Sequence, residues 1–137
     1  MKVRRRADRR RSGAAAVELA FMLPVFFTLT FAQLEAARMG VVTQMLTIAS
    51  RQAARVAVIP GKTQTDVQNA VNVVLANTGI TVGTVAPSPS TWQTDPGGTA
   101  ITVSMSVPYS QVSWLPTPMY FGATILTGSA TLSSERP

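Results

Sequence analysis

Glu18 is the residue of this sequence whose position asks for a chemical explanation, because it is the only charged residue in the apolar run 14–32. A carboxylate at the centre of a bilayer costs about 2.5–3.5 kcal/mol on insertion scales, and less near the membrane edge. Either the membrane edge tolerates Glu18, or an enzyme or a neighbouring subunit recognises it. We favour recognition, since a simple membrane anchor needs no carboxylate.

The chain contains few residues that could catalyse a reaction or bind a metal ion. Cysteine and histidine are both absent, which excludes disulfides, Cys/His zinc sites and a histidine general base. Beyond residue 58 the acidic residues are Asp66, Asp95 and Glu135, and they show neither a carboxylate pair nor a metal-ligand spacing. We therefore expect no enzymatic activity, no metal and no cofactor.

The net charge of +6 lies entirely in the first thirteen residues. Seven basic residues there face one acidic residue, Asp8, whereas the five basic and five acidic residues beyond them cancel. The seven are Lys2, Arg4, Arg5, Arg6, Arg9, Arg10 and Arg11. The remainder of the chain has no excess of cations to hold a phosphate backbone, so we expect no nucleic-acid partner.

The apolar run is long enough to carry Glu18 in a membrane-spanning helix. At about 1.5 Å per residue, residues 14–32 span roughly 28 Å, close to the hydrocarbon core of about 30 Å. The basic residues in front of the run predict a cytoplasmic N-terminus, with the bulk of the chain on the other side. Pro24 predicts a kink, because it removes one helical N–H and crowds the carbonyl of Ala20.

The helix is expected to continue beyond the membrane as an amphipathic helix as far as residue 58. Apolar residues at spacings of three, four and seven predict one packing face, made of Leu34, Val41, Met45, Ile48 and Ala49. Glu35 and Arg38, at i and i+3, predict an ion pair at the membrane edge. Pro60 and Gly61 should end the helix.

The rest of the chain predicts an α+β fold with a small sheet. A second, short helix is expected over residues 64–78, capped by Thr63 or Thr65 and closed by Gly79. Alternating residues and turn signals predict a three-stranded antiparallel sheet, packed on the amphipathic helix, with strands over 80–86, 99–107 and 122–133.

These elements divide the chain into three parts. Residues 1–13 form a basic cytoplasmic leader, residues 14–34 a transmembrane helix, and residues 35–137 an extracytoplasmic domain. The aromatic residues of that domain lie in or beside its loops, at Trp92, Tyr109, Trp114, Tyr120 and Phe121. We expect these side chains to fold back over the sheet, although binding interfaces and membrane surfaces use the same residue types.

The order of residues around Glu18 resembles a known signal. Gly13, Val17, Glu18, Ala20, Leu23 and Pro24 form the pattern G-x-x-x-V-E-x-A-x-x-L-P, directly after the basic run. The pattern resembles a class III prepilin signal, and more narrowly the TadE-like minor pilins (pseudopilins) of the tight-adherence, or Flp, type IVb pilus system. The run 123–132 also resembles that family's closing strand, whereas Leu19 stands where the family commonly has an aromatic residue.

The resemblance implies a function in pilus assembly. A prepilin peptidase would cut between Gly13 and Ala14, and glycine would give it an unhindered bond. The new amine of Ala14 lies about one helical turn from Glu18, so the two groups can pair and set the register of a subunit in a helical bundle. The implied partners are the peptidase, other pilin or pseudopilin subunits and the assembly platform in the bacterial inner membrane, and the implied domain is pilin-like.

Other interpretations make different predictions for the N-terminus. Arg10 and Arg11 are a weak twin-arginine signal, and a conventional secretory signal cut after Ala32 would leave Gln33 first. A chain that keeps its leader would be a membrane-anchored binding module outside any pilus, recognising a ligand through its aromatic loops. The mass of the N-terminus separates these cases.

Overall fold

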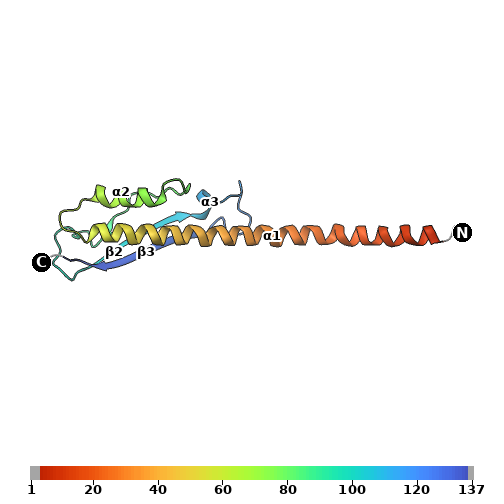
Figure 1. Ribbon diagram of the computed structural model, residues 1–137, viewed down its shortest axis with the longest axis horizontal. Coiled ribbons are helices and arrows are strands. Elements are labelled where there is room, and N and C mark those ends of the chain that lie inside the picture. Colours follow the sequence, from red (N-terminus) through yellow and green to blue (C-terminus); the bar gives the residue numbers. More distant parts are fainter. Residues whose placement is uncertain (1–3, 136–137) are drawn as a thin grey trace. The chain divides into compact units, whose positions relative to one another are not determined.

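The computed structural model describes the backbone of residues 4–135 and the side chains of residues 13–135. The basic side chains of the predicted leader lie outside the described residues. The chain separates into two compact units, Met1–Leu34 and Glu35–Pro137. Helix α1, Arg4–Ala57, contains residues of both units and is the longest element in Figure 1.

The N-terminal unit consists of helix alone, and the helix continues through Pro24. Its threonine hydroxyls donate to carbonyls one turn earlier, from Thr28 to Pro24 at 2.8 Å and from Thr30 to Phe26 at 2.8 Å. These polar groups are therefore satisfied within the helix, as an apolar surrounding requires. The kink at Pro24 stays a prediction.

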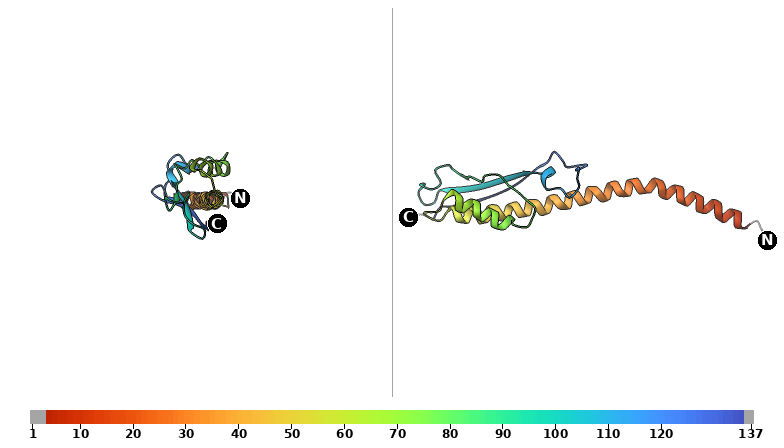
Figure 2. Two further views of the ribbon diagram at one scale, coloured as in Figure 1. Left: turned by 90° about the vertical axis from the view of Figure 1, so that its left-hand side faces the viewer. Right: turned by 90° about the horizontal axis from the view of Figure 1, so that it is seen from above.

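The globular unit is an α+β domain, which confirms the predicted fold class. After α1 come α2 (Gln64–Leu75), β1 (Pro87–Ser88), β2 (Ala100–Pro108), α3 (Tyr109–Val112) and β3 (Ile125–Ser133). The three strands form an antiparallel sheet in the order β1-β2-β3. Seen end-on in Figure 2, the sheet and α2 lie on neighbouring sides of the C-terminal half of α1.

The packing face of α1 differs from the predicted one. Val41 and Ile48 are 42% and 49% exposed, and Leu34 is also exposed, so the predicted face is wrong for these three residues. The buried face carries mostly small side chains, namely Val42, Leu46, Ala49, Ala53, Ala54 and Ala57. On the sheet side a glycine of β3 approaches the backbone of this helix closely. A Cβ at Gly128 would lie 2.4 Å from the carbonyl carbon of Leu46.

The strand predicted over 80–86 is also wrong, because side-chain amides take the place of a neighbouring strand. The backbone N–H of Val85 donates to Oε1 of Gln68 at 2.9 Å, and the Val85 carbonyl accepts from Nε2 of Gln64. Both glutamines belong to α2. Backbone pairing to β2 begins only at Pro87, opposite Val103.

Local signals at the other elements are confirmed. Thr63 caps α2 through a capping box with Asp66, although the helix ends at Leu75 rather than at residue 78. The inward residues of β2 are buried as the alternation predicts: Ile101, Val103, Met105 and Val107. In β3 Leu126 is buried, whereas Leu132 is exposed.

The close approach of β3 to α1 predicts a large effect of a single methyl group. Gly128→Ala should lower the free energy of unfolding by about 1–3 kcal/mol, because the new Cβ overlaps the backbone at Leu46. Thermal unfolding of the intact chain in detergent, followed by circular dichroism, measures this. Gly83→Ala is the control, since a Cβ there meets no atom within 4 Å. Equal unfolding midpoints for the two variants would contradict the packing argument.

Candidate functional site

The predicted processing residues lie together on the surface of α1. Gly13, Ala14 and Glu18 are exposed, and a Cβ at Gly13 would meet no atom within 4 Å. Ala14 and Glu18 are four residues apart, so they lie on one face of the helix about one turn from each other. Gly13 and Ala14 lie within helix α1, and cleavage between them stays a prediction.

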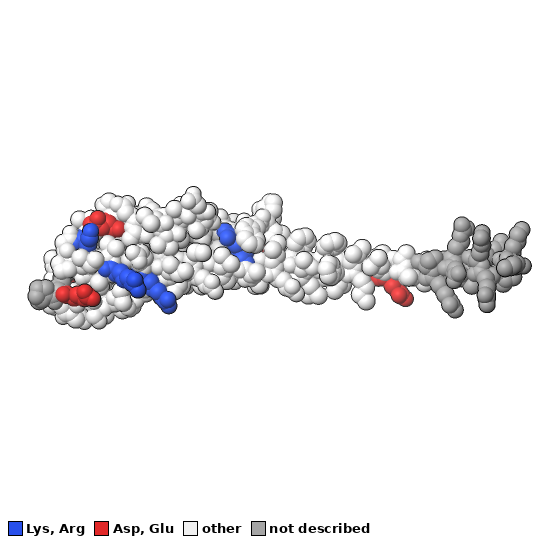
Figure 3. Space-filling view, in the orientation of Figure 1, with Lys and Arg blue, Asp and Glu red and all other residues white. Residues whose placement is uncertain are grey.

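The helix that carries these residues presents its apolar side chains outward. An 18-residue window of the helical stretch Gly13–Ala57 has a mean hydropathy of 1.9, and none of that window is buried. Phe21, for example, is 77% exposed. Figure 3 shows this surface almost without charged side chains. A core helix of a soluble protein would be covered, so this helix fits a single-pass membrane anchor.

Glu35 begins the globular unit as a fully buried carboxylate. Its Oε1 accepts from the backbone N–H of Met119 at 2.7 Å. Its Oε2 accepts from the backbone N–H groups of Tyr120 and Phe121, both at 3.1 Å. One side chain of α1 therefore holds three successive residues of the segment that joins α3 to β3.

Arg38 and Tyr109 connect α3, which precedes that segment, to the same part of α1. Nε of Arg38 donates to the carbonyl of Val112 at 2.8 Å, and its guanidinium lies 5.0 Å from the ring centroid of Trp114. The hydroxyl of Tyr109 donates to the carbonyl of Glu35 at 3.3 Å. We call this arrangement of Glu35, Arg38 and Tyr109 the clamp.

The clamp gives Glu35 and Arg38 partners that the sequence did not predict. Both residues were predicted to pair with each other at the membrane edge, and that ion pair stays a prediction. The partners of Glu35 found here lie 84 to 86 residues further along the chain. The sequence around Glu35 and Arg38 predicts only that the two residues, at i and i+3, lie on one face of the helix.

The electrostatics of Glu35, which follows the apolar segment 14–34, balance two effects. Burial alone would raise the pKa of Glu35, because the charged form loses its water. The N–H groups of Met119, Phe121 and Tyr120 stabilise that form, and their combined effect brings the pKa below its ordinary value of 4.5. Glu35 is therefore ionised at neutral pH and accepts hydrogen bonds only.

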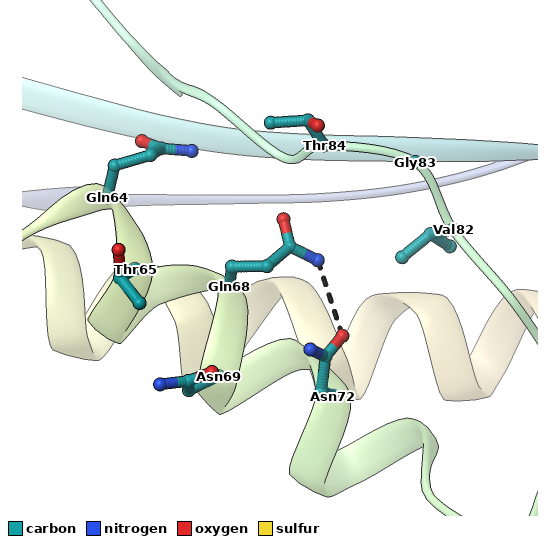
Figure 4. A pocket seen from close by; sticks show the side chains of 8 residues that line it. All are labelled: Gln64, Thr65, Gln68, Asn69, Asn72, Val82, Gly83 and Thr84. Atoms are coloured by element: carbon teal, nitrogen blue, oxygen red, sulfur yellow. Dashed lines mark hydrogen bonds between the residues drawn. The ribbon is translucent and has the colours of Figure 1, made fainter.

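A shallow groove lies between α2 and residues 82–84, and its lining is dominated by amides. Figure 4 shows Gln68 bonded to Asn72 at 3.3 Å, with Gln64 reaching toward the neighbouring segment. Gln64 and Gln68 are already committed to Val85. Among the side chains of residues 13–135, no group of three acidic residues lies close enough to hold a metal ion. Two of the amide side chains that line the groove therefore serve to attach this segment to α2.

Residues 13–55 match the model of the TadE-like protein family. This confirms the resemblance predicted from the G-x-x-x-V-E pattern. No curated protein and no solved structure is significantly similar to the chain.

The matched residues contain all the site residues that the sequence predicted. They begin at Gly13 and include Glu18, Pro24, Glu35 and Arg38, whereas the sheet lies outside them. The clamp therefore joins the family-matched helix to a part of the chain that the family model does not reach.

Substitution of Glu35 should release the loop while the rest of the domain stays folded. In Glu35→Gln, one acceptor oxygen is replaced by an amide group that donates, so the N–H groups of 119–121 lose acceptors. Hydrogen exchange at those three amides should accelerate markedly, while exchange in β2 stays slow. Gln33→Ala, an exposed neighbour on α1, is the control. Unchanged exchange at 119–121 would rule out the clamp.

The lowered pKa of Glu35 also predicts the direction of a pH effect. A carboxyl group whose folded pKa is depressed stabilises the fold above its unfolded pKa, and this contribution is lost as the pH falls through the folded pKa. Wild type should therefore unfold at a higher temperature than Glu35→Gln at neutral pH, and the difference should narrow below pH 4.5. A difference that is independent of pH would contradict an ionised Glu35.

Proposed function

We propose that this chain is a minor pilin, or pseudopilin, that acts in assembling a tight-adherence (Flp) type IVb pilus. One observation carries the proposal: Gly13 and Glu18 lie at the spacing of a prepilin signal on an exposed apolar helix that the TadE-like model matches. The fold class, with a long helix packed on a small antiparallel sheet, supports a pilin-like subunit.

The chemistry proposed for the N-terminus is carried out by a partner enzyme. A prepilin peptidase hydrolyses the bond between Gly13 and Ala14, which releases the basic leader and creates an amine on Ala14. The leader carries the whole excess charge of +6, and the side-chain charges of the remaining chain balance. The proposal assigns no catalytic step to the chain itself.

The new amine gives Glu18 a partner in the membrane. An ionised carboxylate in an apolar medium is unfavourable when it stands alone, and pairing with an amine offsets part of that cost. The amine of Ala14 in the same subunit or in a neighbour is within reach of such a pair, because one helical turn separates the residues. Pairing between subunits would fix how far each helix slides along the next.

The orientation proposed for the chain follows from the charges of its leader before cleavage. The basic residues before Gly13 keep the N-terminus in the cytoplasm, and the globular unit is outside, anchored in the bacterial inner membrane. Other pilin subunits and the assembly platform are then the partners available to the exposed apolar helix. The surface of that helix, open along residues 13–34 apart from half-buried Ala32, is the surface that such partners or lipid would cover.

Processing and assembly are tested separately by one set of strains. The membrane-bound chain should have Ala14 as its first residue when the peptidase is present and retain its leader when it is absent, as read by intact-mass spectrometry. Glu18→Gln should be cut but fail to support pili, because the carboxylate is lost at nearly constant shape. Glu18→Asp, which keeps the charge, is the control and should retain part of the assembly.

Two outcomes would overturn the proposal in different ways. A chain that keeps its leader in the presence of the peptidase would be a membrane-anchored binding module instead. Normal piliation by Glu18→Gln would leave processing intact and remove the role of Glu18 in register.

A further inference from the structure

The loop 113–122, between α3 and β3, exposes large apolar side chains and has no charged residue. Met119 is 63% exposed, Trp114 58% and Tyr120 41%. A small domain usually turns such side chains inward, as this one does with Trp92, which is buried. Their exposure at one place in the fold therefore calls for a surface that covers them.

The clamp fixes where this loop lies. Glu35 holds Met119, Tyr120 and Phe121, and Arg38 lies under Trp114. Glu35 is the residue that directly follows the predicted transmembrane segment 14–34, and Arg38 is about 4.5 Å further along the helix. The exposed side chains are thus attached to the first turn of α1 after the apolar segment ends.

Part of the loop backbone is hydrogen-bonded within the protein. Met119, Tyr120 and Phe121 donate their N–H groups to Glu35, and the N–H of Leu115 donates to Oγ of Ser113 at 3.0 Å. Pro116 and Pro118 have no N–H to satisfy. Backbone donors that are paired internally lose no hydrogen bond when this part of the loop leaves water.

We propose that the loop 113–122 inserts into the boundary between headgroups and acyl chains of the bilayer in which the chain is anchored. Trp and Tyr favour this depth, because each combines an apolar ring with a polar group. On the face in Figure 3, the charged side chains of the globular unit gather mainly at the end where the C-terminus lies. The end of the globular unit that carries the loop 113–122 is the end that we expect to contact lipid.

This inference rests on the membrane anchor and on no other part of the proposed function. It requires neither cleavage after Gly13 nor incorporation in a pilus. A failure of either of those would leave the loop experiment unaffected, because that experiment uses the uncut chain.

The absence of cysteine allows the loop to be probed with single labels. Thr117→Cys places an environment-sensitive fluorophore at an exposed loop position. Ser133→Cys is the matched control, because Ser133 is exposed beside Val58 and Ile59 near the other end of α1. That end is roughly 30 Å along the helix from Glu35, at about 1.5 Å per residue. The intact chain is reconstituted in vesicles of phosphatidylethanolamine and phosphatidylglycerol.

The label at 117 should emit at shorter wavelength than the label at 133. It should be quenched by a quencher attached to the upper acyl chain, and should be severalfold less accessible to iodide. Equal access of iodide to both labels would overturn the proposal. So would protection of position 117 that disappears when the protein is diluted in lipid, since a second copy of the chain would then be the covering surface.

A second variant keeps the test independent of the label. Replacing Trp114 and Met119 with serine leaves the backbone bonds to Glu35 available, and circular dichroism checks that the domain stays folded. In this background the label at 117 should become more accessible to iodide, whereas the label at 133 should not change. No change at either position in the folded variant would show that the two side chains do not hold the loop in lipid.

Discussion

Hydrogen bonding to the buried carboxylate of Glu35 is the constraint on which the arrangement of this domain depends. A buried carboxylate is strongly unfavourable unless polar groups replace its lost water. Here the backbone of residues 119–121 supplies those groups, so the loop before β3 must return to the beginning of the globular part of α1. Arg38 and Tyr109 reinforce the same closure from the segment after β2. The end of β2 and the beginning of β3 are therefore connected in two ways, by the loop between them and by their hydrogen bonds to α1.

The second constraint is the short distance between α1 and β3. Gly128 faces the backbone of Leu46 with no room for a Cβ, and beyond Leu46 the buried face of α1 carries only alanine and Ser50 as far as Ala57. The predicted face was wrong for Leu34, Val41 and Ile48, which point outward, whereas its small residue Ala49 is buried. A hydrophobic pattern in the sequence reflects the size and polarity of side chains. The face of α1 that packs on the sheet also depends on how closely the strands approach the helix backbone.

The sequence predicted those parts of the structure that depend on neighbouring residues. The cap at Thr63, the alternation in β2 and the signal around Gly13 and Glu18 are all contained in short windows. The parts that it did not predict depend on distant partners. The segment 80–86 has the composition of a strand, but Gln64 and Gln68 bind the backbone of Val85 first. Likewise, nothing near Glu35 in the sequence indicates that its acceptors are used by Met119, Tyr120 and Phe121.

The two units follow opposite rules for polar and apolar groups, and the reversal occurs between Leu34 and Glu35. Up to Leu34 the large side chains face outward and the threonine hydroxyls bond within the helix, as lipid requires. Directly after Leu34, the side chains of Glu35 and Arg38 turn inward and are satisfied by the backbone. In a water-exposed helix Glu35 and Arg38 would be expected on the outer face, where solvation costs nothing. Their burial is accounted for if the outer face of α1 next to Glu35 and Arg38 is only partly exposed to water. Hydrogen bonds within the protein then stabilise both charges better than the surroundings of the outer face would.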